Sequence, residues 1–232
     1  MKRLGIVGGL GPESTIDYYR RILEGCRKAG ATESPSIVID SLDVQRGLYL
    51  SGNDHKGLVE YVMGSIERLT AAGVDFIAIA ANTPHLVFDE LASRSRVELV
   101  SIVEACAAEA KRLGLKRLLL LGTRFTMEAP FYPEVFARHD INITAPSESD
   151  RRWVHDRYVN QLLKGEFKDE TRQEIVSFIT RMRTEHALDG VIMGGTELTI
   201  LIPAPTIDGI PVLDTTALHV GAIVGRLVQT AD

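Results

Sequence analysis

Short runs of hydrophobic residues alternate along this chain with longer stretches in which hydrophobic residues recur every three or four positions. The first pattern is typical of buried strands and the second of amphipathic helices. We expect strands at residues 4–9, 36–40, 74–80, 97–102, 117–123, 141–146, 188–194 and 210–214. We expect helices at residues 13–29, 56–72, 85–91, 103–114, 149–164, 168–186 and 215–229. The segment 127–139 is expected to be helical at its end, because Pro130 and Pro133 confine the regular part. This alternation predicts an α/β fold with mostly parallel sheets flanked by helices.

The pattern also repeats itself along the chain. The segment VDFIAIAANT at 74–83 resembles LDGVIMGGTE at 188–197, so that Asp75 corresponds to Asp189, 114 residues later. The same shift relates Ala81 to Gly195, Gly8 to Gly122, Tyr18 to Tyr132, and VELVS at 97–101 to PVLDT at 211–215. An insertion between these landmarks would break the agreement. The repeat therefore predicts two pseudo-symmetric α/β domains.

We place the division between the domains near the predicted helix at 103–114. The first domain is expected to comprise residues 1–102 together with 215–232, because the final helix is predicted to return to the first half. The second domain is expected to comprise residues 103–214. A ligand cleft between two such domains would let one small molecule be contacted from two sides.

Composition narrows the classes of protein that this chain can be. The net charge of −5 argues against a general binder of nucleic acid or acidic membranes. No apolar run approaches the ~18 residues of a transmembrane helix, and the start of the chain lacks a signal-peptide pattern. Cys26 and Cys106 lie on predicted helices, and neither has a partner at metal-binding spacing. We therefore expect a reduced, cytoplasmic protein with no metal site.

Small and polar residues dominate the segments that follow five of the predicted strands. In open α/β sheets the ligand binds at the carboxyl ends of the strands. Hydroxyls, amides and backbone N–H groups there can bind carboxylates or phosphates. These segments, which predict a site for a small anion, are residues 8–15, 40–46, 80–85, 122–128 and 194–199.

Several residues in these segments are candidates for binding or chemistry. Asn82, Thr83 and Thr196 can donate to a carboxylate, although helix N-capping would use the same residue types. His85 can act as an acid–base group, or it can cap or pack. Glu197 can be a base if burial raises its pKa, or it can satisfy backbone N–H groups.

Two further features leave alternatives open. Arg46 follows the second strand and can bind a second carboxylate through its fork of donors, or it can be a solvated loop charge. Gly9 and Gly11 fit the first two positions of a dinucleotide-binding G-x-G-x-x-G, but Ser14 occupies the third. Asp40 ends the next strand, where a ribose-binding acid would lie. The other interpretation of this turn is a tight bend that needs glycine.

The chain resembles the aspartate/glutamate racemase family, the cofactor-independent amino-acid racemases, along nearly its whole length. The segments that carry the resemblance are LGIVGGLGPESTIDYYRRI, LLGTRFTMEAPFY, IMGGTEL and IPVLDTTALH. The resemblance implies two pseudo-symmetric domains with the substrate between them, often in a homodimer. It also implies a reaction that needs no pyridoxal phosphate, nicotinamide or metal.

The resemblance further implies a two-base mechanism. In that family one cysteine precedes Asn-Thr in the first half and another precedes Thr-Glu in the second, and the two sulfurs move the α-proton. Here Ala81 and Gly195 occupy these positions, and neither side chain can carry a proton. By matching position, the resemblance assigns the carboxylate and amine of an amino acid to Asn82, Thr83, Thr123, Thr126 and Thr196. It also assigns the glycine turn at Gly9 to substrate binding and Arg46 to a side-chain carboxylate.

We therefore expect an amino-acid racemase or isomerase that acts on a small acidic amino acid without pyridoxal phosphate. Thr83, Glu197 and His85 are the candidates to replace the missing thiols. The alternative is a lapsed or divergent member of the family that binds a small carboxylate or acts as a lyase. A third explanation is that the two cysteine positions carry introduced substitutions.

Overall fold

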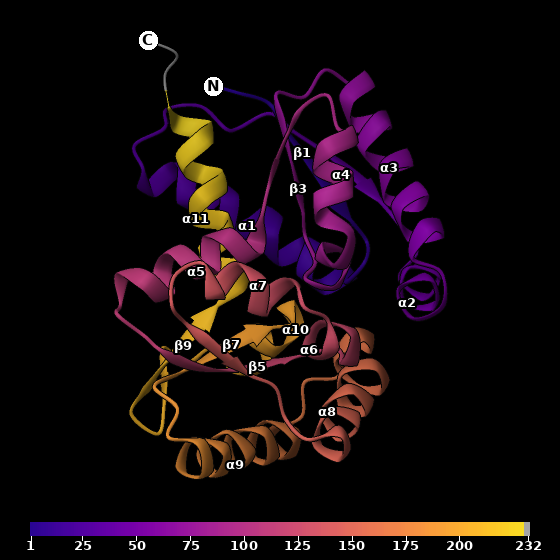
Figure 1. Cartoon of the computed structure of the whole chain (residues 1–232). Helices are drawn as coiled ribbons and strands as arrows, with labels where there is room; N and C mark the ends of the chain where they lie inside the picture. Colours follow the sequence, from indigo (N-terminus) through magenta and orange to yellow (C-terminus); the bar gives the residue numbers. More distant parts are fainter. Residues whose placement is uncertain (230–232) are drawn as a thin grey trace. The chain divides into compact units, whose positions relative to one another are not determined.

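The computed structural model of the protein describes residues 1–229. Its contacts divide the chain into two compact units. Unit 1 consists of Met1–Ile102 and the segment from Thr216 onward, and unit 2 consists of Val103–Thr215. Each unit has a mostly parallel sheet flanked by helices, which confirms the predicted α/β class (Figure 1).

Unit 1 contains a four-stranded parallel sheet in the order β2-β1-β3-β4. Its strands are β1 (Leu4–Gly8), β2 (Ile37–Ser41), β3 (Phe76–Ile79) and β4 (Glu98–Val100). Its helices are α1 (Pro12–Lys28), α2 (Val44–Asn53), α3 (His55–Ala71), the 3-10 helix η1 (Thr83–Val87), α4 (Phe88–Arg94) and α11 (Thr215–Val228).

The two faces of this sheet are covered by different helices. Leu4 and Ile6 of β1 pack in one apolar cluster with α1 and α11, for example with Ile22 and Ile223. Val7 of β1 packs in another cluster with residues of α3. Because side chains alternate between the faces of a strand, one short apolar strand supplies both clusters. The result is a doubly wound unit, with α1 and α11 on one side of the sheet and α3 on the other (Figure 1).

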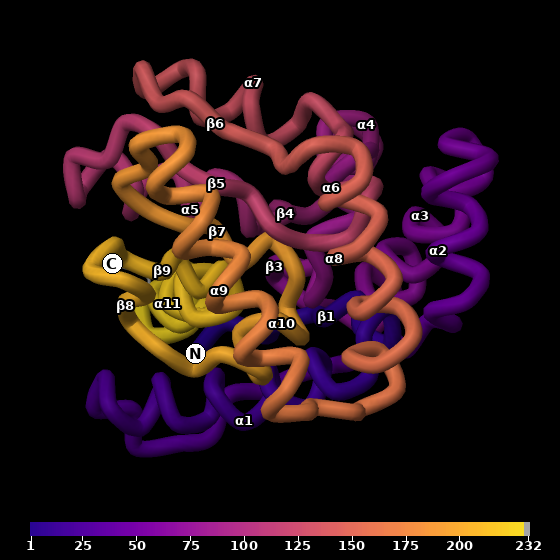
Figure 2. The backbone as a smooth tube through the Cα atoms, turned by 90° about the horizontal axis from the view of Figure 1, so that it is seen from below, coloured from indigo at the N-terminus to yellow at the C-terminus, as the bar shows by residue number. Residues whose placement is uncertain are grey.

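Unit 2 contains a five-stranded sheet in the order β6-β5-β7-β9-β8, in which only β8 is antiparallel to its neighbour (Figure 2). Its strands are β5 (Arg117–Gly122), β6 (Asn142–Thr144), β7 (Gly190–Gly194), β8 (Thr206–Ile207) and β9 (Ile210–Asp214). Its helices are α5 (Ile102–Arg112), α6 (Arg124–Glu128), α7 (Phe131–Ala137), α8 (Glu148–Asn160), the 3-10 helix η2 (Leu162–Lys164), α9 (Asp169–His186) and α10 (Thr196–Leu201).

The core of unit 2 forms where α8, α9 and α10 cover one face of this sheet. Leu119 and Leu121 of β5 and Val191 and Met193 of β7 point into one apolar cluster with residues of these helices. The alternate residues Leu118, Leu120 and Ile192 are also fully buried. In Figure 1, α5 and α7 lie on the side of the sheet opposite to α8 and α9.

The internal repeat is visible in the pairing of the central strands. Leu4 pairs with Phe76 in unit 1, and Leu118 pairs with Gly190 in unit 2, so both partners shift by the same number of residues. Each central pair is also fixed by an aspartate at the start of its second strand. The N–H of Arg3 donates to Asp75 at 2.5 Å, and the N–H of Arg117 donates to Asp189 at 2.9 Å.

At the next strand, β4 in unit 1 and β9 in unit 2, the pairing of the two units differs by one residue. Ile77 pairs with Leu99 in unit 1, whereas its counterpart Val191 pairs with Val212 in unit 2. The predicted equivalence of residues 97–101 and 211–215 is therefore corrected by one position.

Several elements differ from those predicted from the sequence. Residues 40–46 were expected to be a strand end and loop, but α2 begins at Val44, where the Asp43 side chain accepts the N–H of Arg46 at 2.7 Å. The helix expected at the end of 127–139 is α7, which begins after Pro130, and the short α6 precedes it. The helix expected from residue 85 begins as η1 and becomes regular at Phe88.

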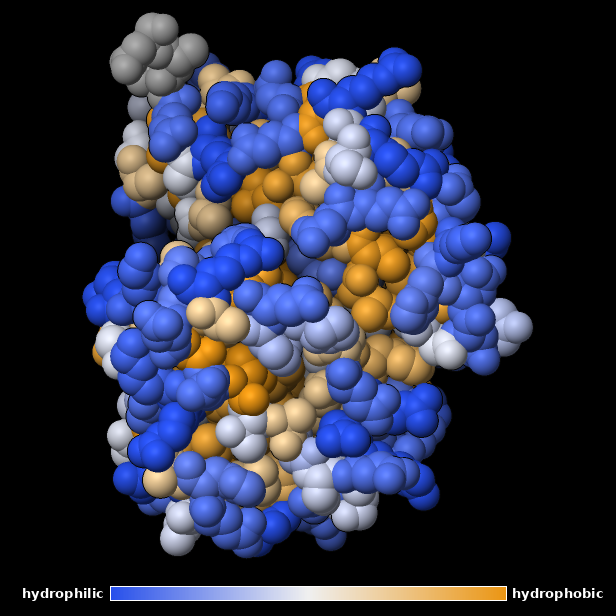
Figure 3. Space-filling view, viewed as in Figure 1, coloured by the Kyte–Doolittle hydropathy of each residue, from blue (hydrophilic) through white to orange (hydrophobic). Residues whose placement is uncertain are grey.

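Hydrophilic residues cover most of the face shown in Figure 3, and hydrophobic residues are visible in smaller areas between them. Within residues 1–229, no helix combines the length and the apolar character needed to cross a membrane.

Candidate functional site

The turn after β1 lies close to the backbone that follows β2. Gly9 has a φ of +80°, and its N–H donates to Thr15 Oγ1 at 2.9 Å. A Cβ at Gly9 would lie 2.2 Å from the carbonyl oxygen of Leu42 and 2.6 Å from its nitrogen. Glycine is thus needed here both for the backbone conformation and for the close approach. This geometry supports the interpretation of the segment as a tight bend.

The acid expected to bind a ribose in the dinucleotide alternative has another partner. Both carboxylate oxygens of Asp40 accept hydrogen bonds from the Arg68 guanidinium, at 3.0 and 2.7 Å. These hydrogen bonds hold the pKa of Asp40 below its usual range. A bidentate pair of this kind occupies the carboxylate that a ribose would need. The dinucleotide interpretation therefore loses its main support.

Asn82 and Thr83 lie directly after β3, the strand next to β1. Asn82 is buried, and Thr83 is partly exposed at the start of η1. The preceding residue, Ala81, offers only a methyl group and its backbone. Parallel neighbouring strands end at the same edge of a sheet, so Gly9, Asn82 and Thr83 belong to one edge of unit 1.

The ring of His85 fixes the backbone around this edge. Its Nε2 accepts the N–H of Ile102 at 3.3 Å, so Nδ1 carries the proton and donates to the carbonyl of Ala81 at 3.0 Å. The ring also stacks on Phe88, with centroids 4.9 Å apart. Burial lowers the pKa of His85 to about 3. The sequence left His85 as either an acid–base group or a capping or packing residue; in the structure it is a neutral ring that holds the Ala81 turn against the start of α5.

A second buried histidine, His219 on α11, links three elements of unit 1. Its Nε2–H donates to the carbonyl of Val100 at 2.9 Å, and its Nδ1 accepts the hydroxyl of Tyr18, also at 2.9 Å. Burial lowers the pKa of His219 to about 4. The rings of His219 and His85 lie 6.4 Å apart between centroids. Protonation of either ring would break one of its hydrogen bonds and place a charge beside the other.

These rings predict a stability that falls in mild acid. Both pKa values are depressed in the folded state, so below about pH 6.5 the unfolded chain binds protons that the folded chain does not. The contribution of each neutral ring to the free energy of unfolding is fully present above that pH. It declines below that pH, by about 2 kcal/mol per ring at about pH 5. Urea unfolding at pH 7 and 5 measures the loss. The variant His219→Gln should be less stable at pH 7 but should lose about 2 kcal/mol less on acidification; an unchanged loss would contradict the assignment.

Arg46 lies in the first turn of α2 and is exposed. Its guanidinium carbon lies 4.6 Å from the centroid of the Tyr61 ring, a cation–π distance. The Tyr61 hydroxyl in turn accepts the N–H of Asp43, the N-cap of α2, at 2.7 Å. This packing holds Arg46 near the end of β2. The role of Arg46 in binding a side-chain carboxylate stays a prediction.

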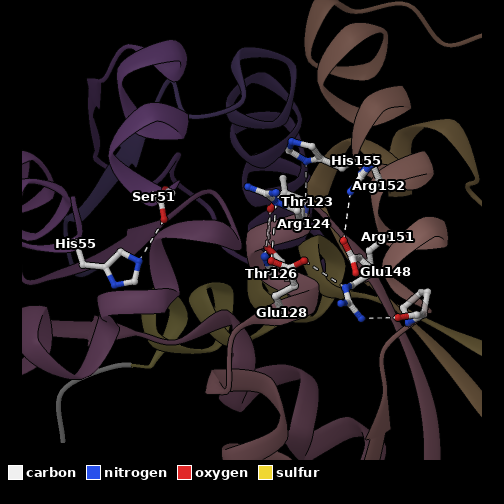
Figure 4. Close-up of polar contacts among 11 residues, drawn as sticks. Ser51, His55, Thr123, Arg124, Thr126, Glu128, Glu148, Arg151, Arg152 and His155 are labelled. Atoms are coloured by element: carbon white, nitrogen blue, oxygen red, sulfur yellow. Dashed lines mark hydrogen bonds and ion pairs between the residues drawn. The ribbon is translucent and has the colours of Figure 1, made fainter. Parts of the chain in front are cut away.

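Two threonines lie just after the end of β5 in unit 2 (Figure 4). Thr123 is the N-cap of α6, and its Oγ1 accepts the N–H of Thr126 at 3.2 Å. The two hydroxyl oxygens are also 3.2 Å apart, and both side chains are buried. The N–H of Arg124 donates to Nδ1 of His155 on α8 at 3.1 Å. The predicted binding residues of this segment therefore form a preorganised pair of hydroxyls beside α8.

The helix α6 also carries charged side chains. Figure 4 shows Arg151 of α8 extending toward Glu128 at the end of α6, with 3.3 Å between Nε and Oε1. Arg124 also lies 3.8 Å from Glu128. Desolvation and the nearby Arg124 charge lower the pKa of His155. In unit 1, the same figure shows the His55 ring, whose Nε2 is 3.2 Å from the carbonyl of Ser51.

The end of β7 carries a buried phenol and carboxylate. The hydroxyl of Tyr158, on α8, donates to Oε2 of Glu197 in a short hydrogen bond. The Thr196 hydroxyl donates to the same oxygen at 3.0 Å. Desolvation, with the nearby Glu197 charge, raises the pKa of Tyr158 well above its usual value. β7 is the neighbour of β5, so Thr123, Thr126, Thr196 and Glu197 belong to one edge of unit 2.

Sequence reasoning did not identify Tyr158 as part of this edge. A single tyrosine on an amphipathic helix is typical of packing, and it lies 39 residues from its carboxylate partner. Both cysteines are buried: Cys26 is packed in the α1–α11 cluster, and Cys106 lies on α5. Burial raises the pKa of both thiols.

Comparison with known proteins identifies the family of this chain. The family model described as Asp/Glu/Hydantoin racemase matches residues 7–223. A solved structure of a candidate Asp/Glu racemase from Yersinia pestis is 31% identical, covers 99% of this chain and 100% of its own, and has a TM-score of 0.86. An aspartate racemase homologue from Pyrococcus horikoshii OT3 is 30% identical, with coverages of 99% and 100% and a TM-score of 0.82.

A curated relative covers a smaller part of the chain. The broad specificity amino-acid racemase RacX of Bacillus subtilis (strain 168) is 29% identical over 137 residues. That match spans 57% of this chain and 59% of RacX, which is less than two thirds of its length. The match of the family model over most of the chain and the two full-length structural relatives agree with one another. The chain belongs to the Asp/Glu/hydantoin racemase family.

Proposed function

We propose that the protein is an amino-acid racemase that acts on aspartate, glutamate or a closely related acidic amino acid without pyridoxal phosphate. The observation that carries this proposal is the family match over residues 7–223, which includes the strand ends of both units. The racemase names of the relatives favour an enzyme over a lapsed binding protein. We further propose that it works in the cytoplasm as a homodimer.

The binding residues that we propose are short neutral donors at the two sheet edges. Asn82 and Thr83 in unit 1, and Thr123, Thr126 and Thr196 in unit 2, would donate to the carboxylate of the amino acid or accept from its amine. Arg46 would bind the side-chain carboxylate through its guanidinium fork. Gly9 would contribute by letting the backbone come close. Neutral hydroxyls and amides suit a substrate that carries both charges, because they can serve as donors or acceptors.

We propose that Thr83 is the residue of unit 1 that carries a proton in the reaction. Its hydroxyl follows Ala81 and Asn82, and it is partly exposed where its neighbours are buried. Ala81 cannot move a proton, and the His85 ring is neutral because it is buried, with both ring nitrogens hydrogen-bonded to the backbone. The Thr83 hydroxyl therefore remains as the proton-carrying side chain among residues 81–85.

The experiment is incubation of each enantiomer of aspartate and glutamate with the protein in deuterium oxide. We expect loss of the α-proton signal by NMR and appearance of the opposite enantiomer by chiral chromatography. A lyase would consume the substrate without forming the opposite enantiomer. Binding seen by calorimetry without exchange would support the lapsed-protein alternative and contradict the proposal.

A variant pair tests the assignment of Thr83. Thr83→Val keeps the shape of the side chain and removes the hydroxyl, and we expect at least a roughly 100-fold loss of exchange, the size of one acid–base group. The matched control is Thr184→Val on the exposed face of α9, which should retain full activity. Equal activities of the two variants would exclude Thr83 from the reaction.

A further inference from the structure

We infer that Tyr158, backed by Glu197, is the proton-transferring group of unit 2. This inference rests on the proposed racemase function and adds to it a catalytic residue. Its starting point is the fit between Gly195 and the ring of Tyr158 at the carboxyl end of β7.

Gly195 leaves its side-chain space to the tyrosine. A Cβ built on Gly195 would lie 2.4 Å from Cε2 of Tyr158, 2.9 Å from Cζ and 3.0 Å from the hydroxyl oxygen. The backbone of Gly195 is extended, with a φ of −141°, so glycine is not needed there for conformation. Glycine is needed for space: the phenol lies where any side chain of residue 195 would begin. The phenol hydroxyl at the carboxyl end of β7 therefore comes from a residue of α8, and not from a residue of the strand.

The hydroxyl of Tyr158 has a defined proton path. It donates to Oε2 of Glu197 in a short hydrogen bond, and the N–H of Glu197 points to the phenol oxygen at 3.5 Å. The Thr196 hydroxyl, which also donates to Oε2, fixes the carboxylate. The phenol and the carboxylate therefore share one proton within a geometry held by three consecutive residues of the β7–α10 turn.

Burial of this pair costs free energy. Tyr158 is 4% exposed and Glu197 is 1% exposed. Burying a hydrogen-bonded carboxylate costs more free energy than filling the same space with apolar residues. Paired titratable groups at the ligand-binding end of a sheet are the arrangement expected of acid–base catalysts. The raised pKa of Tyr158 keeps the phenol protonated in the resting protein.

The step that we infer moves two protons in sequence. The α-proton of the substrate passes to the phenol oxygen of Tyr158 while the phenol proton passes to Oε2 of Glu197. The electron pair of the broken C–H bond stays on the substrate and is delocalised toward its carboxylate. The pair changes from one proton and one negative charge to two protons and no charge. Reversal returns a proton to the same face of the carbon, and a proton delivered by water or a hydroxyl to the other face completes inversion.

The test uses the hand of the substrate. One base serves one face of the α-carbon, so loss of the base blocks exchange of the enantiomer whose proton it removes. In deuterium oxide, Tyr158→Phe should lower α-proton exchange of one enantiomer at least roughly 100-fold and leave exchange of the other within about 3-fold. Glu197→Gln should affect the same enantiomer, because it removes the terminal acceptor of the relay.

A matched control separates this role from packing. Tyr18→Phe removes an equally buried, hydrogen-bonded phenol from unit 1, and it should change the exchange of both enantiomers alike. Folding of each variant is checked by circular dichroism. A folded Tyr158→Phe protein that exchanges both enantiomers at wild-type rates, or loses both equally, would overturn the inference alone. A wild-type protein that exchanges no acidic amino acid would overturn the proposed function.

Discussion

A protein carrying Gly9→Ala should lose roughly 2 to 5 kcal/mol of folding stability and its activity. Two costs add. The left-handed φ of +80° disfavours any residue with a Cβ, by about 1 to 2 kcal/mol. The new methyl group would also lie 2.2 Å from the carbonyl oxygen of Leu42, and backbone atoms cannot move aside as a flexible side chain can. Such overpacking costs roughly 1 to 3 kcal/mol. Urea unfolding followed by circular dichroism measures the loss.

Gly30→Ala is the matched control for this experiment. Gly30 has a φ of +84°, close to that of Gly9, but a Cβ there would have no atom within 4 Å. Its substitution should therefore cost only the conformational part, about 1 to 2 kcal/mol. Equal losses in the two variants would show that the contact with Leu42 carries no energy and that the β1–α1 turn is looser than described.

Gly195→Ala should have the largest effect at the edge of unit 2. The added methyl group would overlap the Tyr158 ring, at a cost of roughly 1 to 3 kcal/mol. If the ring moves away, the buried Glu197 carboxylate keeps the Thr196 hydroxyl but loses the phenol, and a hydrogen bond to a charged group contributes roughly 1.5 to 3 kcal/mol. Unfolding followed by the fluorescence of Trp153, which packs against Phe178 in unit 2, reports on this loss.

A double-mutant cycle isolates the contact between these two residues. Tyr158→Ala removes the ring, so Gly195→Ala should add little further loss in its background. A coupling near zero between the two substitutions would mean that the methyl group and the ring do not meet. Because of the same overlap, Gly195→Cys can be accommodated only if Tyr158 is also replaced by a smaller residue.

The strand pattern and the internal repeat were readable from the sequence because they depend on local apolar periodicity. β1 and β5 end in glycines, and their apolar runs are fully buried, as expected for central parallel strands. Long amphipathic helices such as α1 and α9 lie within one residue of their predicted limits.

Short elements were missed because tertiary packing, and not local periodicity, forms them. α10 spans six residues with two β-branched threonines, and it is held by the burial of Leu198 and Leu201. β8 has two residues and exists through its pairing with β9. α2 did leave a signal in the sequence, since Asp43 is a favourable N-cap three residues before Arg46.

The roles of the polar side chains were the least readable. The residue types at the strand ends predicted the edges of the two sheets but not the state of each group. His85 is neutral because it is buried, and its Nε2 accepts the N–H of Ile102, 17 residues away. Glu197 accepts a hydrogen bond from a phenol on a distant helix. Such pairings depend on how elements pack, and no spacing along the chain encodes them.

The helix α11 has a consequence for how the protein is made. Val220, Ile223 and Leu227 complete the cluster that covers Leu4 and Ile6, yet all of unit 2 is encoded between them. The ribosome therefore synthesises all of unit 2 before it synthesises α11, the last helix of unit 1. During synthesis the N-terminal strands wait with one apolar face uncovered, and the unit that starts first is the one that finishes folding last.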